Sequence, residues 1–176
     1  MVYTFAIGSE KLYDFLHLNP LCATYPVDIV NNPFQIALND KQVSVNNALM
    51  IDIFGQVSSE MVDFRQVSGI GGQLDFMMGA FYSEGGKSFL CMPSTRKLKD
   101  GQVVSRIVPF LPQGSVVTDS RVFPMYIVTE YGKVYIQGCP VWDRAEKLIK
   151  IAHPDFRDDL IKAAQKYGIW TRTNRI

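Results

Sequence analysis

The sequence has almost no excess charge of either sign, because 18 Lys and Arg residues stand against 17 Asp and Glu residues, for a net charge of +1. A protein that binds nucleic acid by neutralising phosphates would be clearly basic, so this class is excluded. No apolar run approaches the length that crosses a membrane, and the first residues show no basic segment followed by an apolar one. We therefore expect no membrane partner and a cytoplasmic location.

Cysteine and histidine are scarce. Cys22, Cys91 and Cys139 lie far apart without a C-x-x-C motif, which indicates reduced thiols rather than a disulfide framework. His17 and His153 are the only histidines, and no ligand spacing links them to each other or to the cysteines. We predict no metal site. A G-x-S-x-G motif is also missing, so the sequence gives no signal of a serine hydrolase.

The length and apolar content suit one domain, 1–176, with 47% hydrophobic residues and no linker or internal repeat. Short β-rich or apolar runs predict strands over 25–30, 43–46, 49–54, 88–92, 103–110, 115–118, 125–129 and 134–136. Helical spacing predicts helices after Ser9, over 34–38 and 74–81, from Pro140, and over 156–167 with Gly168 as the residue that ends the helix. The fold class is α/β, a mixed sheet with flanking helices.

A glycine-rich stretch, SGIGGQLDF at 68–76, precedes the predicted helix 74–81. Gly69, Gly71 and Gly72 remove side chains from a turn, so its amides can face an anion at close range. The alternative is an ordinary tight turn. The dinucleotide fingerprint G-x-G-x-x-G fails here, because Leu74 stands at the third glycine position. A phosphate-loop match at 81–88 fails as well, because Phe81 replaces its first glycine and a strand follows.

A series of motifs, in this order and spacing, resembles the C-terminal region of the acetyl-CoA hydrolase/transferase family. The nearest subgroup is that of 4-hydroxybutyrate and butyrate–acetate CoA-transferases. The motifs are PVD at 26–28 with Asn31 and Pro33, VSVNNA at 43–48, SGIGGQLDF at 68–76, GGKS at 85–88, PST at 93–95, SRIVP at 105–109, TEYG at 129–132 and IAHPDFR at 151–157.

The resemblance implies a CoA-transferase C-terminal domain of the NagB/RpiA/CoA-transferase-like fold. Such an enzyme moves coenzyme A from an acyl-CoA to a short-chain carboxylate without a metal or redox cofactor. A glutamate attacks the thioester, and an enzyme–CoA thioester follows. In the family that glutamate lies upstream of the region matched here, so the chain resembles an incomplete domain that is inactive alone. Four of its acids, Glu10, Glu60, Glu84 and Glu146, are expected to be solvated surface residues.

The same resemblance implies roles for individual residues. Gly71 and Gly72 would place amides at the acyl oxygen, with Gly69 permitting the turn. Asn31 would face the reacting centre, with a helix cap as its alternative role. The residues implied at the CoA thiol arm, phosphates or pantetheine path, or beside them, are Gln73, Arg106, Ser120, Arg121 and Glu130.

Each arginine could equally form a surface ion pair. The segment 122–124 departs from the polar run that the family usually carries after Ser120 and Arg121. His153 is expected to be structural, at a helix junction.

Other functions remain open at this point. The chain could be a non-catalytic CoA-binding or assembly subunit, or part of an acetyl-CoA hydrolase, in which water replaces the acceptor acid. A homodimer or a complementary N-terminal half is the expected protein partner, since a truncated domain exposes apolar surface that its missing half would cover.

Overall fold

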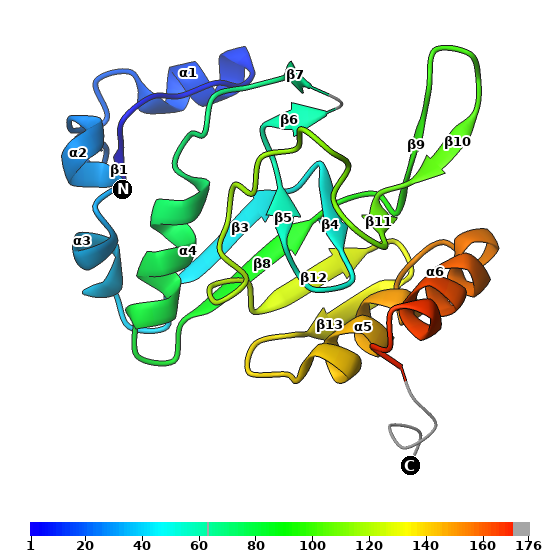
Figure 1. Cartoon of the computed structure of the whole chain (residues 1–176). Coiled ribbons are helices and arrows are strands. Elements are labelled where there is room, and N and C mark those ends of the chain that lie inside the picture. The colour runs from blue at the N-terminus through cyan, green and yellow to red at the C-terminus, as the bar shows by residue number, and fades with distance from the viewer. Residues whose placement is uncertain (63, 171–176) are drawn as a thin grey trace.

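A four-stranded sheet forms the centre of the molecule, which we describe from a computed structural model covering residues 1–62 and 64–170 (Figure 1). Its strand order is β13-β12-β8-β3. Strands β3, β8 and β12 run parallel, and β13 is antiparallel to β12. Their bounds are Val43–Asn47 (β3), Lys87–Cys91 (β8), Tyr126–Thr129 (β12) and Gly132–Tyr135 (β13). The predicted α/β class with a mixed sheet is confirmed, and the run predicted over 88–92 supplies an interior strand.

Smaller sheets surround this one. A three-stranded sheet has the order β11-β4-β5, with bounds Ile107–Val108 (β11), Met50–Asp52 (β4) and Val57–Ser58 (β5). Two antiparallel hairpins follow, β6 (Met61–Val62) with β7 (Arg65–Gln66) and β9 (Thr95–Lys97) with β10 (Val103–Ser105). Near the N-terminus, β1 (Val2–Tyr3) pairs in parallel with β2 (Ala23–Thr24).

Two helices, α3 (Pro33–Ala37) and α4 (Gln73–Tyr82), pack against each other, and α4 also packs on β3 and β8. The Asn32 side chain caps α3 by accepting hydrogen bonds from the amides of Phe34 at 3.0 Å and Gln35 at 3.4 Å. At the other end of the chain, α5 (Val141–Lys150) packs on β13 and on α6 (Pro154–Lys166). The remaining helices are α1 (Glu10–Leu16) and α2 (Val27–Val30).

Predictions about the last helix are confirmed. His153 caps α6, since its Nδ1 accepts a hydrogen bond from the amide of Asp155 at 3.3 Å. Gly168 follows the helix with a φ of 69°, in the left-handed region that glycine adopts readily. The polar end of the sequence, 170–176, is expected from its composition to form a tail or to dock on a partner, and its residues 171–176 lie outside the described part of the chain.

One apolar core joins the central sheet, the small sheet and the helices. It includes Leu90 of β8, Ile127 of β12, Met77 of α4, Ile51 of β4 and Leu148 of α5. These side chains all come from one face of the central sheet and from the elements that cover it. Burial on this face therefore holds the long-range parts of the fold together.

The opposite face of the central sheet is largely uncovered. Alternate residues of β3 point to it, and Val43 and Val45 are 53% and 65% exposed. An aromatic row continues across it, with Phe89 stacked on Tyr126 at 4.8 Å between ring centroids and Tyr126 against Tyr135 at 5.0 Å. We call this surface, which comprises Val43, Val45, Phe89, Tyr126, Val128 and Tyr135, the bare sheet face.

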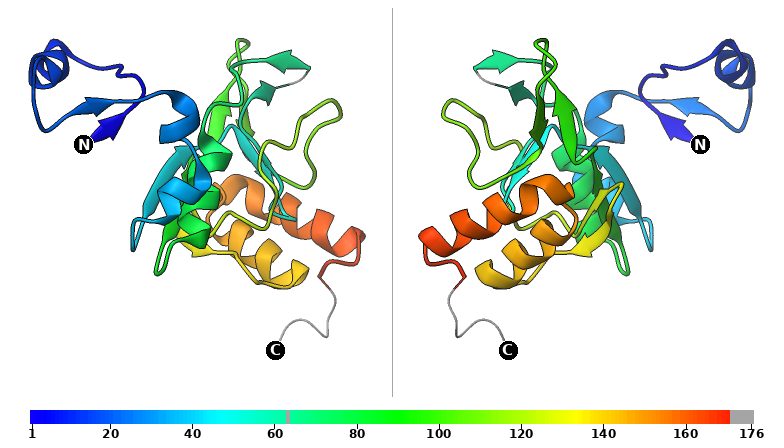
Figure 2. Two further views of the ribbon diagram at one scale, coloured as in Figure 1. Left: turned by 90° about the vertical axis from the view of Figure 1, so that its left-hand side faces the viewer. Right: turned by 90° about the vertical axis from the view of Figure 1, so that its right-hand side faces the viewer.

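Residues 1–30 form an arm that projects from the body of the molecule, as both views in Figure 2 show. We call this segment the N-terminal arm. Helix α1 buries none of its residues, and several large apolar side chains of the arm are exposed, among them Phe5, Ile7, Leu18 and Leu21. Contiguous exposed apolar side chains of this kind are uncommon on isolated soluble chains.

Two strand predictions are wrong. The β-rich run 25–30 forms the single helical turn α2, because Pro26 fixes its own φ at −54° and no neighbouring strand is available to pair with Val27–Val30. The run 115–118 forms no strand either. The residue that follows it, Asp119, makes one isolated bridge with Val57. In the described part of the chain no helix is both long and apolar enough to cross a bilayer.

Candidate functional site

The glycine loop 68–72 connects the β6–β7 hairpin to the start of α4. Gly71 has a φ of 59°, and a Cβ added at Gly69 or Gly71 would meet no atom within 4 Å. Within residues 1–62 and 64–170, the amides of Gly69, Ile70, Gly71 and Gly72 donate no hydrogen bond. The first regular amide contact of α4 is that of Phe76 with the carbonyl oxygen of Gly72, at 3.0 Å. The loop therefore offers unpaired donors at the positive end of a helix.

A cleft of about 380 Å³ lies beside this loop. Its other wall is the carboxyl end of β3 and the residues that follow, Asn46, Asn47, Ala48 and Leu49. Ligands of α/β proteins commonly bind at the carboxyl ends of parallel strands, where loops meet. The sequence predicts a ligand-binding role for the glycine loop but none for the end of β3 that faces it.

Asn31 lies directly against the glycine loop. A Cβ added at Gly72 would collide with the side-chain amide of Asn31. The capping role proposed as its alternative belongs to the neighbouring residue Asn32, whereas Asn31 ends α2. The Asn31 side chain forms no hydrogen bond with any described residue, and it lines a second cavity of about 320 Å³ together with Asn46, Gly72 and Gln73. The tertiary structure thus brings Asn31, Gly72 and Gln73 together.

Gln73, the first residue of α4, makes contacts that the sequence did not indicate. Its Nε2 donates to the Oγ of Ser59 at 2.7 Å and to the Oδ2 of Asp119 at 2.5 Å. Asp119 is fully buried, and its Oδ1 has no hydrogen-bond partner among the described residues. Burial raises the pKa of Asp119 to about 6, although the Gln73 hydrogen bond lowers it, and the charge of Glu60 raises it further.

Glu60 is not the solvated acid that the sequence predicted, because only 9% of it is exposed. Its Oε1 accepts a hydrogen bond from the Oγ1 of Thr118 at 3.2 Å. Its carbonyl oxygen accepts from the amides of Val67 and Ser68, at the entrance of the glycine loop. The cause is tertiary, since the segment around Thr118 folds over β5 and covers it. We call Ser59, Glu60, Gln73, Thr118 and Asp119 the buried acid cluster.

Glu130, a predicted CoA contact, lies at the carboxyl end of β12 and is engaged with Ser94. The amide of Ser94 donates to one carboxylate oxygen at 2.9 Å, and its hydroxyl donates to the other at 2.5 Å. Partial burial acts to raise the pKa of Glu130, but the Ser94 hydrogen bonds outweigh it and the pKa lies below its usual value. These bonds tie the end of β12 to the loop after β8.

Arg106 is held in the body of the molecule. Its Nη1 donates to the carbonyl oxygen of Leu49 at 3.2 Å, and its Nε is buried without a partner among the described residues. Burial lowers its pKa, and the charge of Arg96 adds to that effect. Arg106 makes no ion pair with a described acid, so the surface ion pair considered as its alternative role is not formed there. It lines a cavity of about 200 Å³ that shares Leu49 with the glycine-loop cleft.

Ser120 and Arg121 follow Asp119 and are exposed. Neither lines the glycine-loop cleft, and neither does Glu130 or Arg106. The structure therefore brings together the catalytic candidates Gly71, Gly72 and Asn31 with Gly69 and Gln73, and it places the other four candidates outside this cleft. In the part of the chain that the structure describes, no group of three histidines, cysteines or acids is arranged to hold a metal ion.

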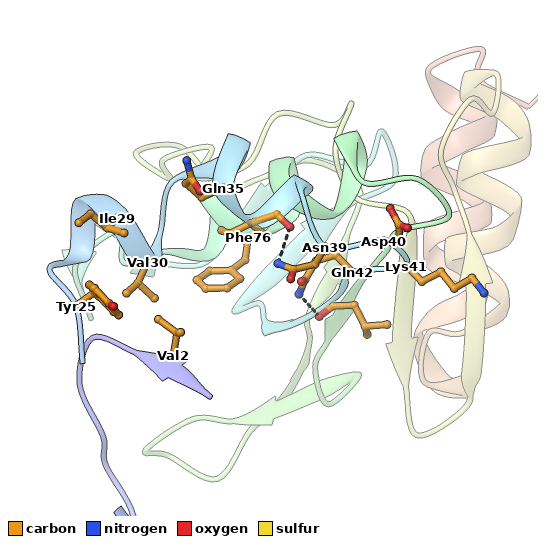
Figure 3. Close-up of a pocket in the computed structure, with 12 residues that line it drawn as sticks. Val2, Tyr25, Ile29, Val30, Gln35, Asn39, Asp40, Lys41, Gln42 and Phe76 are labelled. Atoms are coloured by element: carbon orange, nitrogen blue, oxygen red, sulfur yellow. Dashed lines mark hydrogen bonds between the residues drawn. The ribbon is translucent and has the colours of Figure 1, made fainter. Parts of the chain in front are cut away.

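A further cavity, of about 660 Å³, lies between the N-terminal arm, α3 and the start of β3 (Figure 3). Val2, Tyr25, Ile29, Val30 and Phe76 supply its apolar wall. Two of its three amide side chains are engaged locally, because Asn39 donates to the carbonyl oxygen of Ile36 and Gln42 donates to that of Val43. This cavity therefore offers apolar contact more than polar recognition.

Comparison with known proteins gives a consistent result. The sequence profile of the acetyl-CoA hydrolase/transferase C-terminal domain matches residues 8–164. The chain is 53% identical to the butyryl-CoA:acetate CoA-transferase of Anaerostipes caccae, over 98% of this chain and 39% of that enzyme. It is 48% identical to the 4-hydroxybutyrate coenzyme A transferase of Clostridium kluyveri, over 94% of this chain and 38% of that enzyme.

Solved structures with similar sequences have the same fold as this chain. RipA from Yersinia pestis superposes with a TM-score of 0.85 at 44% identity, covering 96% of this chain and 37% of RipA. The 4-hydroxybutyrate CoA-transferase from Porphyromonas gingivalis gives a TM-score of 0.75 at 39% identity, covering 94% and 37%. The chain thus spans less than two fifths of the length of these structures, and 39% of the Anaerostipes enzyme. It belongs to the acetyl-CoA hydrolase/transferase family and corresponds to the C-terminal domain of that family.

Proposed function

We propose that this chain is the C-terminal part of a CoA-transferase that moves coenzyme A between a short-chain acyl-CoA and a carboxylic acid. The observation that carries the proposal is the set of unpaired amides at Gly71 and Gly72, beside Asn31 in an open cleft. The names of its relatives support butyrate, acetate or 4-hydroxybutyrate as the acid.

The chemistry needs donors of this kind. When a carboxylate attacks a thioester, negative charge develops on the acyl oxygen, and amides fixed beforehand near that oxygen stabilise it. The amides of Gly71 and Gly72 would supply these donors, and the free side chain of Asn31 would add a further polar group. Neither step of such a covalent exchange requires a metal, because the carboxylate and the thiolate are themselves the nucleophiles.

The attacking carboxylate would come from a part of the protein that this chain does not contain. The family resemblance places the nucleophilic glutamate upstream of the matched region. The bare sheet face and the N-terminal arm would receive that upstream part, since both expose apolar side chains beside the cavity of about 660 Å³. We further propose a homodimer in the cytoplasm, as the sequence predicted.

A fusion tests the proposal. The upstream part of the Anaerostipes caccae butyryl-CoA:acetate CoA-transferase, joined to this chain, should exchange CoA between butyryl-CoA and acetate, whereas the chain alone should not. Replacement of the glutamate nucleophile in the upstream part should abolish the exchange. Exchange by the isolated chain would contradict the missing nucleophile, and a folded but inactive fusion would contradict the transferase assignment.

A substitution in the fusion tests the role of the loop. Gly72→Ala should lower kcat about 10²-fold, because the new Cβ displaces Asn31 and shifts the loop amides. The control is Gly138→Ala, at a turn outside the cleft where the Cβ meets no atom within 4 Å but where the φ of 70° strains an alanine, so it reports the effect of local strain away from the loop. We expect the control to stay within a few-fold of the unmodified fusion. Equal losses in both variants would separate the loop from catalysis.

The same assays distinguish the alternatives. A hydrolase would release free CoA from acetyl-CoA without an acceptor acid, and more distant relatives with that name exist, such as the acetyl-CoA hydrolase of Candida albicans at 30% identity. A non-catalytic subunit would bind CoA in calorimetry, but its fusion would show no turnover of either kind.

A further inference from the structure

The buried acid cluster contains the carboxylate of Asp119, which has few hydrogen bonds to stabilise a negative charge. Asp119 is fully buried, and its Oδ2 accepts a single hydrogen bond, from Gln73, while its Oδ1 has no partner among the described residues. The charged group that acts on it is another acid, Glu60. No lysine or arginine forms a described ion pair with either residue. An ionised carboxylate is costly in such a place, so Asp119 is poised to take up a proton.

The partner of Asp119 is a group with two different ends. The carboxamide of Gln73 carries a donating NH₂ and an accepting oxygen. In the structure the NH₂ points inward and donates to both Ser59 and Asp119. The carboxamide oxygen has no hydrogen-bond partner among the described residues, and Gln73 lines the glycine-loop cleft. The inward NH₂ fits an ionised Asp119, because an ionised carboxylate only accepts hydrogen bonds.

Protonation of Asp119 changes this match. A protonated carboxyl group carries an O–H donor, which is satisfied best if Gln73 turns its oxygen inward to accept it. The Ser59 hydroxyl can either accept or donate, so it accommodates both orientations. When the oxygen turns inward, the NH₂ of Gln73 turns toward the cleft. The carboxamide then adds a donor beside the unpaired amides of Gly71 and Gly72.

We propose that Asp119 is a positioning residue whose protonation state selects which end of the Gln73 carboxamide faces the glycine-loop cleft. Ionised Asp119 keeps the NH₂ buried and leaves an acceptor at the cleft, whereas protonated Asp119 places a donor there. The catalytic meaning of the switch rests on the proposed transferase function, because a donor would stabilise a developing acyl oxyanion. The orientation of Gln73 itself does not depend on that function.

Nuclear magnetic resonance of the ¹⁵N-labelled chain tests the proposal without substrate or turnover. The side-chain NH₂ signals of Gln73 and the amide signals of Gly71 and Gly72 would be followed from pH 4.5 to pH 8. We expect all of them to shift with one inflection near pH 6, the pKa of Asp119. The inflection should disappear in Asp119→Asn.

Asp75 provides the matched control. It lies in the first turn of α4, two residues from Gln73, and burial raises its pKa as well. In Asp75→Asn the inflection of Gln73 should remain. The absence of an inflection in the unmodified chain would overturn the proposal, as would its persistence in Asp119→Asn or its loss in Asp75→Asn. If Asp119→Asn does not fold, the side-chain carboxyl ¹³C signal of Asp119 in the unmodified chain replaces it: this signal should titrate with the same inflection as Gln73, and a different inflection would overturn the proposal.

The result of the Gln73 titration is independent of the activity measured for the fusion. An inactive fusion with a clear Gln73 titration would reject the transferase assignment and keep the switch. An active fusion in which the titration is missing would reject the switch alone. In an active fusion we expect the pH profile of kcat/KM to lose a step near pH 6 in Asp119→Asn.

Discussion

The burial of the Asp119 side chain determines how tightly it holds a proton. Burial raises its pKa from 3.8 to about 6, so the folded chain holds this proton more tightly than the unfolded chain does. The resulting stabilisation is fully present below the ordinary pKa of 3.8 and is lost as the pH rises through about 6. An acid that weakens the fold at neutral pH is typical of a functional position rather than of a structural one.

Asp119→Asn should therefore stabilise the chain at pH 7.5, by up to about 3 kcal/mol, since each unit of pKa shift corresponds to about 1.4 kcal/mol. The asparagine oxygen can still accept the Gln73 hydrogen bond. The gain should shrink toward zero as the pH falls to 4. Urea unfolding at a series of pH values measures the free energy of unfolding, and a gain that stays constant with pH would contradict this explanation.

At the scale of elements, the contact between α3 and α4 depends on a glycine. Gly79 lies in the middle of α4 and is buried, and a Cβ there would collide with Ile36 of α3. Glycine costs a helix about 1 kcal/mol relative to alanine. Its presence here is explained by the close approach of α3, which also positions Asn31 and the α2–α3 corner beside the glycine loop.

Gly79→Ala should destabilise the chain by about 1–2 kcal/mol, because overpacking at Ile36 exceeds the gain in helix propensity. A Cβ at position 79 would collide with both the Cγ2 and the Cβ of Ile36, so only the double substitution Gly79→Ala with Ile36→Gly removes the side-chain collision. In the Ile36→Gly background, Gly79→Ala should therefore destabilise the chain by less than it does in the parent chain. Denaturant unfolding of the parent chain, the two single variants and the double variant gives the four free energies of unfolding. Additive effects of the two changes would refute a direct contact.

At the scale of the whole molecule, the central sheet is covered on one face and bare on the other. Strand β3 is also an edge strand, so its outer side is free to pair. The bare sheet face, the edge of β3 and the projecting N-terminal arm together expose many large apolar side chains.

We expect the chain by itself to self-associate through this surface. Val45→Lys, at a position of the bare sheet face that is 65% exposed, should lower the mass measured by light scattering at a fixed concentration. It should change the free energy of unfolding by less than about 0.5 kcal/mol. Val103→Lys, at an exposed strand position on the β9–β10 hairpin, is the control and should leave the mass unchanged. A monomeric parent chain would refute the expectation.

Local patterns in the sequence predict much of the fold. The apolar run at 88–92, the helical spacing after the glycine loop and the residue Gly168 each correspond to an observed element, since periodicity and turn chemistry act over a few residues. The same reasoning is wrong at 25–30, where β-branched residues form a helical turn because no strand lies beside them. Strand propensity requires a neighbour, and a neighbour is a tertiary property.

The candidate site, like the fold, has a part that the sequence predicts and a part that it does not. The sequence alone determined the glycine loop, because three glycines in four positions leave amides that no side chain shields. It could not reveal Asp119, which reads as a turn residue and lies 46 positions from Gln73. Only the tertiary structure brought these two side chains together, buried Glu60 beside them and left one sheet face uncovered. Such contacts depend on how distant segments pack and exclude water, which no local pattern specifies.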